Sequence, residues 1–243
     1  MTRLSVNINK VATLRNTRSI GIPSVVHTAR ICLDAGAHGI TVHPRPDQRH
    51  IRPDDVRDIA ELLKSYPGAE FNIEGNPFHQ YLDLIEEIRP TQCTLVPDSP
   101  EASTSDHGWE FPADSRRLAP VIRKLKRLGS RVSLFMDARA ESMDSAAQLG
   151  ADRIELYTAP YSDEFNGGNM AVLDRYTASA RRAQELGMGV NAGHDLNLKN
   201  LRPFLQAVPN VLEVSIGHAL IADALEFGLA ATVRKYLDVV SGR

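Results

Sequence analysis

DAGAHGITVH, residues 34–43, closes a helical stretch on glycine and passes directly into a short apolar run. Three more stretches have this form: RLGSRVSLFM (127–136), QLGADRIELY (148–157) and ELGMGVNAG (185–193). Glycine supplies the left-handed residue on which helices commonly end, so each copy marks a joint between a helix and a strand. This weak internal repeat predicts strands that alternate with helices, the order typical of a parallel sheet.

The same alternation extends over the whole chain. Eight short apolar runs are interpreted as strands, at residues 4–8, 39–44, 70–75, 92–97, 131–137, 152–158, 189–194 and 212–218, with segments of helical period between them. Eight such units in about 240 residues fit a closed barrel better than an open doubly wound sheet of roughly five or six strands. The expected fold class is therefore α/β, a (β/α)₈ TIM barrel with additional helices.

No proline- or serine-rich linker interrupts this pattern, so a single domain over residues 1–243 is expected. The longest irregular stretches are 98–112 and 158–170. Long loops in a compact domain are usually functional or mobile, which makes both stretches candidates for site loops.

The composition is that of a soluble globular protein, with 42% hydrophobic and 24% charged residues and a net charge of −2. Because no long run of one charge sign occurs, neither a nucleic acid nor a membrane surface is an expected partner. MTRLSVNINK lacks the apolar core of a signal peptide, and a cytoplasmic protein is expected. Cys32 and Cys93 lie in apolar segments without a CxxC pair, which favours two buried reduced thiols over a disulfide or a metal site.

Polar residues gather at the C-terminal ends of the expected strands, where barrels of this kind build their active sites. A carboxylate or an imidazole at the end of a buried strand is expected to have a structural or functional role, because burying such a group without a partner costs several kcal/mol. Reading only those ends gives Asn7, His43, Glu74, Asp137, Glu155, His194, Gly217 and His218.

Each of these residues also has a structural interpretation. Glu74 could be a carboxylate at a helix start, favoured by the helix dipole. Glu155, between two apolar neighbours, must point opposite to them and hence into the barrel, where it could form a buried ion pair or serve a site. His194 could merely orient a loop, and Asp137 is best explained as the cap of the following helix.

The coincidence of positions favours catalysis. Separate strands bring His43, Glu74, Glu155 and His194 to one end of the barrel. Two imidazoles and two carboxylates can carry out successive proton transfers, because their surroundings can separate their pKa values into acid and base roles. Several proton transfers indicate condensation or isomerisation more than simple hydrolysis.

Cationic residues indicate the kind of substrate. Arg45 is expected at the mouth of the second strand with His50 close by, while Arg15 and Arg18 follow the first strand. The guanidinium fork matches phosphate oxygens, although a solvated rim is the alternative and is preferred for Arg49 and Arg52.

A second anion-binding site is expected where the eighth strand meets the start of a helix. The backbone N–H groups at Gly217 and His218 would bind the anion there. Two separate anion-binding sites, one at Arg45 and His50 and one at Gly217 and His218, indicate either a bisphosphate substrate or two phosphorylated small-molecule substrates.

Seven motifs, in order along the chain, together resemble the pyridoxine 5′-phosphate synthase family: VNINKVATLRNTR (6–18), GITVHPRPDQRHI (39–51), FNIEGNP (71–77), CTLVPDSPEASTSDHGW (93–109), RIELYTAPY (153–161), VNAGHDLNLKNL (190–201) and SIGHALIADAL (215–225). The resemblance implies a cytosolic (β/α)₈ barrel that assembles as a homo-octamer. It also implies a transferase-class synthase that joins 1-deoxy-D-xylulose 5-phosphate to 3-amino-2-oxopropyl phosphate. The vitamin B6 ring would form with release of phosphate and water, and neither a metal nor an organic cofactor is needed.

The resemblance also implies roles for individual residues. His43 and Glu74 look like general bases, His194 like the proton donor, and Glu155 like the group that stabilises cationic states. The residues that would hold the amino-ketone phosphate are Asn7, Arg18, Gly217 and His218. Those that would hold the deoxyxylulose phosphate are Arg45, His50 and Thr104.

The chain departs from the family's usual pattern at two places. NINKVATLR has Asn9 and Lys10 where N-x-D-H-x-A-T-L-R is common, and Asp195 follows His194 where A-G-H-G-L is common. With histidine counted as neutral, the first change makes the end of the first strand more positive by two units. The second change adds one negative charge near a phosphate. We hypothesise that they compensate: Lys10 pairs with Asp195 or takes over a phosphate contact.

Two other functions are considered. A metal-dependent hydrolase could use the four acid/base residues as ligands, but the second strand offers only one imidazole there, and Arg45 beside a metal is unfavourable. A catalytically silent barrel that binds a phosphate-sugar or a vitamer is the alternative from another class. A pure binder has little use for two inward carboxylates and two histidines.

Overall fold

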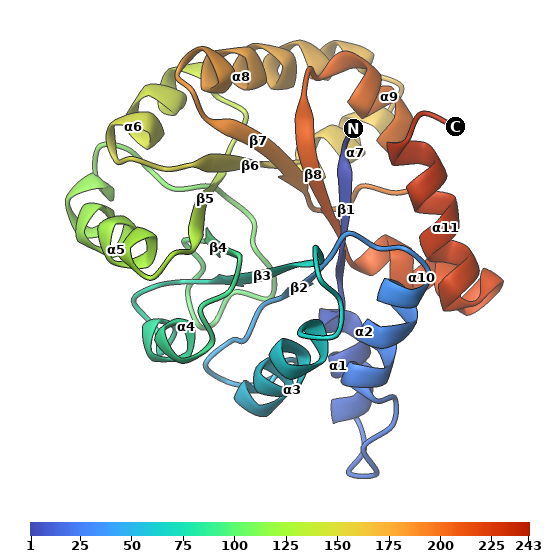
Figure 1. Cartoon of the computed structure of the whole chain (residues 1–243). Helices are drawn as coiled ribbons and strands as arrows, with labels where there is room; N and C mark the ends of the chain where they lie inside the picture. The colour runs from blue at the N-terminus through green and yellow to red at the C-terminus, as the bar shows by residue number, and fades with distance from the viewer.

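The computed structural model describes all residues from 1 to 243, and eight parallel strands form a closed barrel in chain order (Figure 1). The strands are β1 (Arg3–Asn7), β2 (Gly39–Val42), β3 (Glu70–Gly75), β4 (Gln92–Leu95), β5 (Arg131–Met136), β6 (Arg153–Tyr157), β7 (Gly189–Gly193) and β8 (Val211–Ile216). Each predicted strand is confirmed to within two residues at either end.

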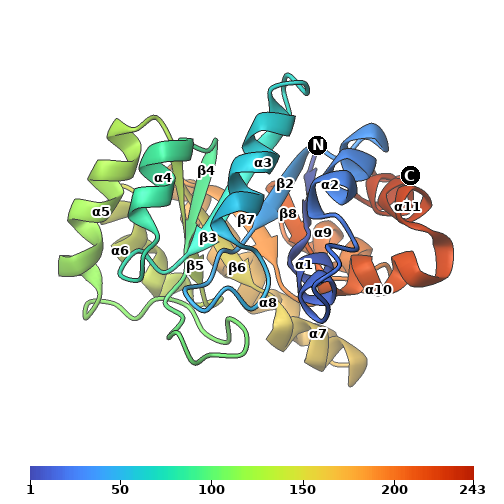
Figure 2. The ribbon, with the colours of Figure 1, turned by 90° about the horizontal axis from the view of Figure 1, so that it is seen from below.

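Helices surround the barrel on the outside (Figures 1 and 2). They are α1 (Asn9–Asn16), α2 (Val25–Asp34), α3 (Pro53–Leu63), α4 (Leu82–Ile88), α5 (Ser115–Arg127), α6 (Met143–Gln148), α7 (Ala159–Asn166), α8 (Leu173–Glu185), α9 (Leu201–Ala207), α10 (His218–Phe227) and α11 (Leu229–Val240). Two short 3₁₀ turns, η1 (Ala140–Ser142) and η2 (Met170–Val172), precede α6 and α8. None of the helices is both long and apolar enough to cross a membrane.

One of the two predicted loops is a helix instead. Residues 98–112 contain no helix or strand, as expected, but the prediction of an irregular stretch at 158–170 is wrong because α7 occupies most of it. Pro160 lies in the first turn of α7, where its fixed φ favours a helix start. The glycines that suggested a loop, Gly167 and Gly168, begin only after the helix ends.

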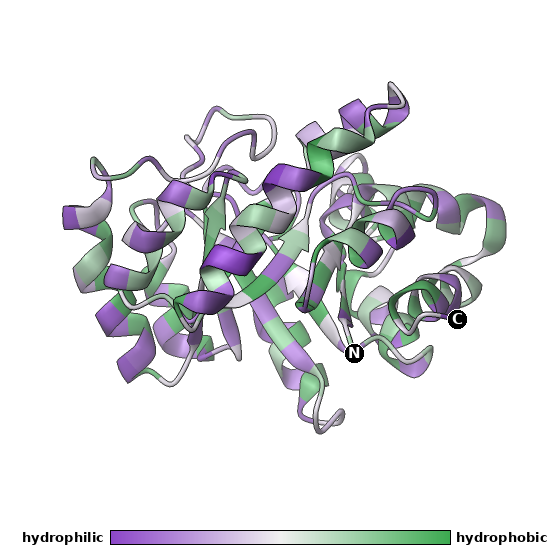
Figure 3. Ribbon diagram, turned by 90° about the horizontal axis from the view of Figure 1, so that it is seen from above, coloured by the Kyte–Doolittle hydropathy of each residue, from purple (hydrophilic) through white to green (hydrophobic).

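Successive side chains along each barrel strand point alternately outward, toward the helices, and inward, into the barrel. Apolar side chains such as Val6, Ile40 and Ile73 point outward and are fully buried beneath the helices. The helices show the matching pattern, with hydrophobic positions interleaved with hydrophilic ones (Figure 3). Cys32 and Cys93 belong to this outer core as free buried thiols, as predicted.

The interior of the barrel is filled with polar side chains rather than branched aliphatic ones. Ser5 and Thr41 share a hydrogen bond of 2.6 Å, and the Thr94 hydroxyl donates to Asn72 at 3.0 Å. Buried polar groups that satisfy one another in this way cost little. The interior therefore forms a continuous polar column that leads up to the C-terminal ends of the strands.

Candidate active site

A polar cavity of about 230 Å³ opens at the C-terminal end of the barrel. Seventeen residues line it and none is hydrophobic. Twelve of the fourteen predicted site residues are among them, namely Asn7, Asn9, Lys10, His43, Arg45, His50, Glu74, Thr104, Glu155, His194, Gly217 and His218. The others are Thr13, Arg49, Ser103, Ser105 and Ser215. The strand-end positions that the sequence singled out thus converge on one cavity.

Glu74 and His43 form the closest acid/base pair in the cavity. The His43 Nδ1 atom lies 3.9 Å from a Glu74 carboxyl oxygen, and the Asn7 amide donates to the same oxygen at 3.5 Å. Burial, followed by the negative charge of Glu155, raises the pKa of Glu74 well above its usual range. Burial, followed by the positive charge of Arg45, lowers the pKa of His43 well below its usual range.

Glu155 lies inside the barrel, as its position between apolar neighbours predicted. Its side chain is buried, and the Thr94 hydroxyl donates to it at 3.5 Å. Burial, followed by the charge of Glu213, raises the pKa of Glu155 to about 8. Gly193 leaves the room for this carboxyl, because a Cβ there would lie 2.4 Å from Glu155 Oε1.

Asn9 and Lys10, the departures in the first motif, have different environments. The Asn9 side-chain oxygen accepts a hydrogen bond from the His43 backbone N–H at 2.9 Å, so Asn9 orients the strand that carries His43. Lys10 lines the cavity, and its amine has no carboxylate within 4.0 Å. The first form of our hypothesis, a direct Lys10–Asp195 ion pair, is therefore not present.

Arg45 and His50 lie on the β2 side of the cavity. Arg45 is buried in an ion pair with Asp98 and also donates to the Ala102 carbonyl at 2.9 Å. The His50 Nδ1 atom accepts from the Ile51 N–H at 2.9 Å, which leaves Nε2 for a ligand. Burial and then the positive charges of Arg45 and Lys10 lower the pKa of His50 to about 4.

The eighth strand supplies the second side of the cavity. Gly217 precedes α10 and approaches Asn7 so closely that a Cβ would lie 3.1 Å from the Asn7 side chain. The N-terminus of α10, with His218 as its first residue, therefore opens toward the cavity next to Lys10. Free backbone N–H groups at a helix start favour an anion.

Two predicted site residues do not line the cavity. Arg18 is exposed in the turn that follows α1, because that helix carries the chain away from the barrel mouth before Arg18 is reached. Asp195 lies beside the cavity, with its carboxyl oxygen 3.5 Å from His194 Nδ1. Arg15 is also not a ligand candidate, since its guanidinium is buried in an ion pair with Asp55.

The expectation that Arg49 is a solvated rim residue is wrong. Its guanidinium donates to the carbonyl oxygens of Pro100 and Ala102, each at 2.8 Å, and it lines the cavity. The long β4–α5 loop therefore lies against the β2–α3 loop at one end of the barrel (Figure 2). No local pattern around Arg49 indicates this contact, because the partner is 51 residues away.

Four further lining residues were not identified from the sequence. Ser215 could have been found from strand alternation, since it points inward two residues before Gly217. Thr13 lies one helical turn after Asn9, a weaker signal. The loop serines Ser103 and Ser105 carry no signal that distinguishes them from any other loop serine.

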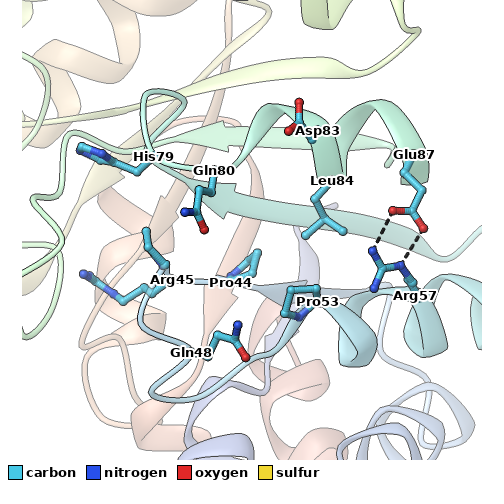
Figure 4. A pocket seen from close by; sticks show the side chains of 11 residues that line it. Pro44, Arg45, Gln48, Pro53, Arg57, His79, Gln80, Asp83, Leu84 and Glu87 are labelled. Atoms are coloured by element: carbon cyan, nitrogen blue, oxygen red, sulfur yellow. Dashed lines mark hydrogen bonds and ion pairs between the residues drawn. The ribbon is translucent and has the colours of Figure 1, made fainter.

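A second hollow of about 220 Å³ lies outside the barrel mouth, between the β2–α3 loop and α4 (Figure 4). Its far end is closed by the ion pairs that join Arg57 to Glu87. Arg45 lines both hollows, but its guanidinium is engaged with Asp98 and Ala102. The second hollow contains no pairing of carboxylate and imidazole like that of Glu74 and His43.

No three His, Cys, Asp or Glu side chains converge in a way that could hold a metal ion. The four acid/base residues of the cavity do not form such a group.

Comparison with known proteins gives a consistent result over the whole chain. Residues 4–242 match the family described as "Pyridoxal phosphate biosynthesis protein PdxJ". The chain is 58% identical to the pyridoxine 5′-phosphate synthase of Albidiferax ferrireducens over 246 residues, which covers 99% of this chain and 98% of that one. It is 55% identical to the enzyme of the same name from Xylella fastidiosa, covering 98% and 95% of the two chains.

Solved structures show the same barrel at much lower sequence identity. Phosphoribosyl anthranilate isomerase from Thermotoga maritima is 17% identical, covers the whole of both chains and has a TM-score of 0.64. Thiamine phosphate pyrophosphorylase from Pyrococcus furiosus is 14% identical, covers 99% of this chain and 96% of its own, and has the same TM-score. At this identity the likeness concerns the fold alone.

Proposed function

Because this chain belongs to the pyridoxine 5′-phosphate synthase family and has that activity, we propose that the cavity at the barrel mouth performs it with the residues assigned above. The enzyme joins 1-deoxy-D-xylulose 5-phosphate to 3-amino-2-oxopropyl phosphate and releases phosphate and water as the pyridine ring forms. The roles proposed are general bases for His43 and Glu74, proton donor for His194 and stabiliser of cationic states for Glu155.

His43 is suited to the role of base. Its lowered pKa favours the neutral imidazole, which is the form that can accept a proton. Burial, and then the positive charges of Arg45 and Arg49, disfavour a protonated His43 ring. A base that releases its proton readily can be used in more than one step.

Glu74 and Glu155 are suited to a substrate that carries positive charge. Burial raises both pKa values, so the neutral forms of these carboxyls are favoured. A substrate ammonium or an iminium placed between them would favour the ionised forms, because an opposite charge within ~4–6 Å lowers the pKa of a carboxyl. Binding of the amino ketone would thus convert Glu74 into a base and Glu155 into a counter-charge.

The two phosphates are assigned to opposite sides of the cavity. Arg45, His50 and Thr104 would receive the deoxyxylulose phosphate, while Asn7, Gly217 and His218 would receive the amino-ketone phosphate. Lys10 stands beside Gly217 and His218 with no carboxylate partner, so the second form of our hypothesis, a phosphate contact, is proposed for it. Arg18 cannot serve this cavity from its present place and is left without a role there.

The assembly and the location are also proposals. We propose one domain over residues 1–243, a homo-octamer and a cytoplasmic enzyme. Large apolar side chains are exposed in α1, in the α1–α2 loop and near the end of α10, as a subunit contact would require.

The observation that carries the proposal is the convergence of His43, Glu74, Glu155 and His194 on one polar cavity. The test supplies purified protein with both substrates and measures phosphate release together with pyridoxine 5′-phosphate. Glu74→Gln and His194→Asn are each expected to lower kcat by about 10²- to 10⁴-fold, because each removes a proton-transfer group.

Asp163→Asn, an exposed carboxyl on α7 outside the cavity, serves as the control and is expected to keep the wild-type rate. Near-normal rates for both cavity variants would contradict the assigned roles. Binding of both substrates without either product would indicate the silent binding barrel instead.

A further inference from the structure

The His194 ring has two contacts, and one of its nitrogen atoms has no hydrogen-bond partner. Its Nε2 atom lies 2.9 Å from the Thr104 hydroxyl, and its edge packs against Tyr157 with the ring centroids 5.2 Å apart. Nδ1 is buried and has no hydrogen-bond partner. A buried polar atom of this kind has a cost that calls for an explanation.

The nearest charged group to that atom is the carboxylate of the next residue, Asp195. Its Oδ2 atom lies 3.5 Å from His194 Nδ1, which is beyond a good hydrogen bond but within reach of a small side-chain rotation. The pKa of Asp195 lies below its usual value, first because of His194 and then because of the positive charges of His218 and Lys10. The carboxylate therefore stays negative beside the ring.

The turn that carries both residues is held in a strained conformation. His194 has φ 87° and Asp195 has φ 59°, values that residues other than glycine rarely adopt. The Thr158 hydroxyl donates to the His194 carbonyl oxygen, and the Asn200 amide donates to the Asp195 carbonyl oxygen at 3.1 Å. Partners from two other segments thus fix the backbone that carries the imidazole and the carboxylate.

We propose that Asp195 is a positioning residue for His194: its carboxylate accepts a hydrogen bond from the Nδ1–H group and keeps the Nε2 proton directed at the substrate. The proposed step is a single proton transfer. Nε2 gives its proton to the departing oxygen, and His194 is left as the neutral tautomer with its proton on Nδ1, still facing Asp195. This inference rests on the role of proton donor proposed above for His194.

The change at position 195 also fits its electrostatic surroundings. Relative to the family pattern described above, Asn9 removes one negative charge and Lys10 adds one positive charge at the start of α1, a net change of +2. Positive charge nearby opposes an imidazolium, and a carboxylate beside the ring offsets that effect. The carboxylate of Asp195 thus lies where its negative charge offsets the positive charge of Lys10.

The test is a double-mutant cycle between Asp195 and His194. Asp195→Asn keeps the size of the side chain and tolerates a positive φ, so the turn is expected to survive. It is expected to lower kcat by about tenfold while the KM of each substrate stays within about twofold, because only proton delivery is affected. Asp195→Glu is expected to recover part of the loss.

In the His194→Asn background the same change is expected to have almost no further effect, since a partner that acts only through His194 has nothing left to act on. Asp163→Asn removes one negative charge from the same end of the barrel without touching His194, and it is expected to leave kcat unchanged in both backgrounds.

An equal loss from Asp195→Asn with and without His194 would overturn the inference, and so would a change confined to KM. An unaffected kcat in the single variant has the same consequence. A different result would contradict the proposed function: a normal rate for the His194→Asn single variant would show that His194 is not the proton donor.

Discussion

Single residues in this barrel are placed by strand alternation. Glu155 and Glu74 point inward because their neighbours along the strand point outward into the helical layer. The two carboxyls then share one polar interior with Glu213. Burial raises the pKa of both, Glu155 and Glu213 add to the rise at Glu74, and Glu213 adds to the rise at Glu155. Keeping such groups in the barrel lowers stability at neutral pH, which is common for residues that serve a reaction.

Glu155 should therefore make the stability of the ligand-free enzyme depend on pH. Its pKa rises from 4.5 to about 8, so the folded state binds the proton more tightly than the unfolded state. The stabilising contribution of that proton is fully present below about pH 4.5 and is lost as the pH rises through about 8. Glu155→Gln cannot ionise and is expected to exceed the wild type by up to a few kcal/mol at pH 8, with the gap shrinking toward pH 5.

Urea unfolding at pH 5 and pH 8 measures this gap. Glu226→Gln, on the exposed face of α10, is the control and is expected to show no pH-dependent difference from wild type. A gap of equal size at the two pH values would show that the proton on Glu155 is not the cause.

At the scale of elements, the two halves of the β4–α5 loop are held by different contacts. Trp109 is anchored because its indole N–H donates to the Leu95 carbonyl oxygen at 2.8 Å and its ring packs against Phe78. Residues 98–106 instead depend on Arg45 and Arg49, which reach across from the β2–α3 loop. The first half of the predicted loop 98–112 is therefore held mainly through these two arginines.

Removing one of these arginines should loosen only that half. Arg49→Ala eliminates the donors to Pro100 and Ala102, and we expect amide hydrogen exchange in residues 98–106 to become at least several-fold faster. Exchange around Trp109 should not change. Arg57→Ala loses an exposed arginine paired with Glu87 and serves as the control. Equal acceleration in both variants would contradict a specific hold by Arg49.

At the scale of the whole molecule, closure of the barrel leaves no free sheet edge, so assembly has to use helices and loops. Five of the eight large hydrophobic side chains that are exposed lie on one side, in or near α1 and α10 (Figures 1 and 2). They are Leu14, Ile20, Ile22, Leu225 and Phe227. An exposed apolar surface of this kind fits the contact between copies that an octamer needs.

Charge placed on this surface should break the assembly. If the proposed octamer uses this surface, Ile22→Asp combined with Leu225→Asp shifts the mass measured by light scattering from that octamer to smaller species, because a carboxylate is costly in an apolar contact. Leu212→Asp, at an exposed leucine at the start of β8, is the control and should keep the wild-type mass. Dissociation of the control alone would place the contact at the other end of the barrel.

The sequence by itself determined the barrel, the positions of its eight strands and twelve of the fourteen site residues that line the cavity. The barrel, the strands and nine of these residues follow from local rules, namely glycine-ended helices, strand alternation and the common end at which parallel strands terminate. Asn9, Lys10 and Thr104 follow instead from the resemblance to the family. Only the tertiary structure decided the place of Arg49, Arg18 and Asp195, the helix at 159–166 and the polar interior. These depend on which loops meet across the barrel mouth and on partners as many as 90 residues away, such as Thr104 and His194. No local pattern encodes contacts of that kind.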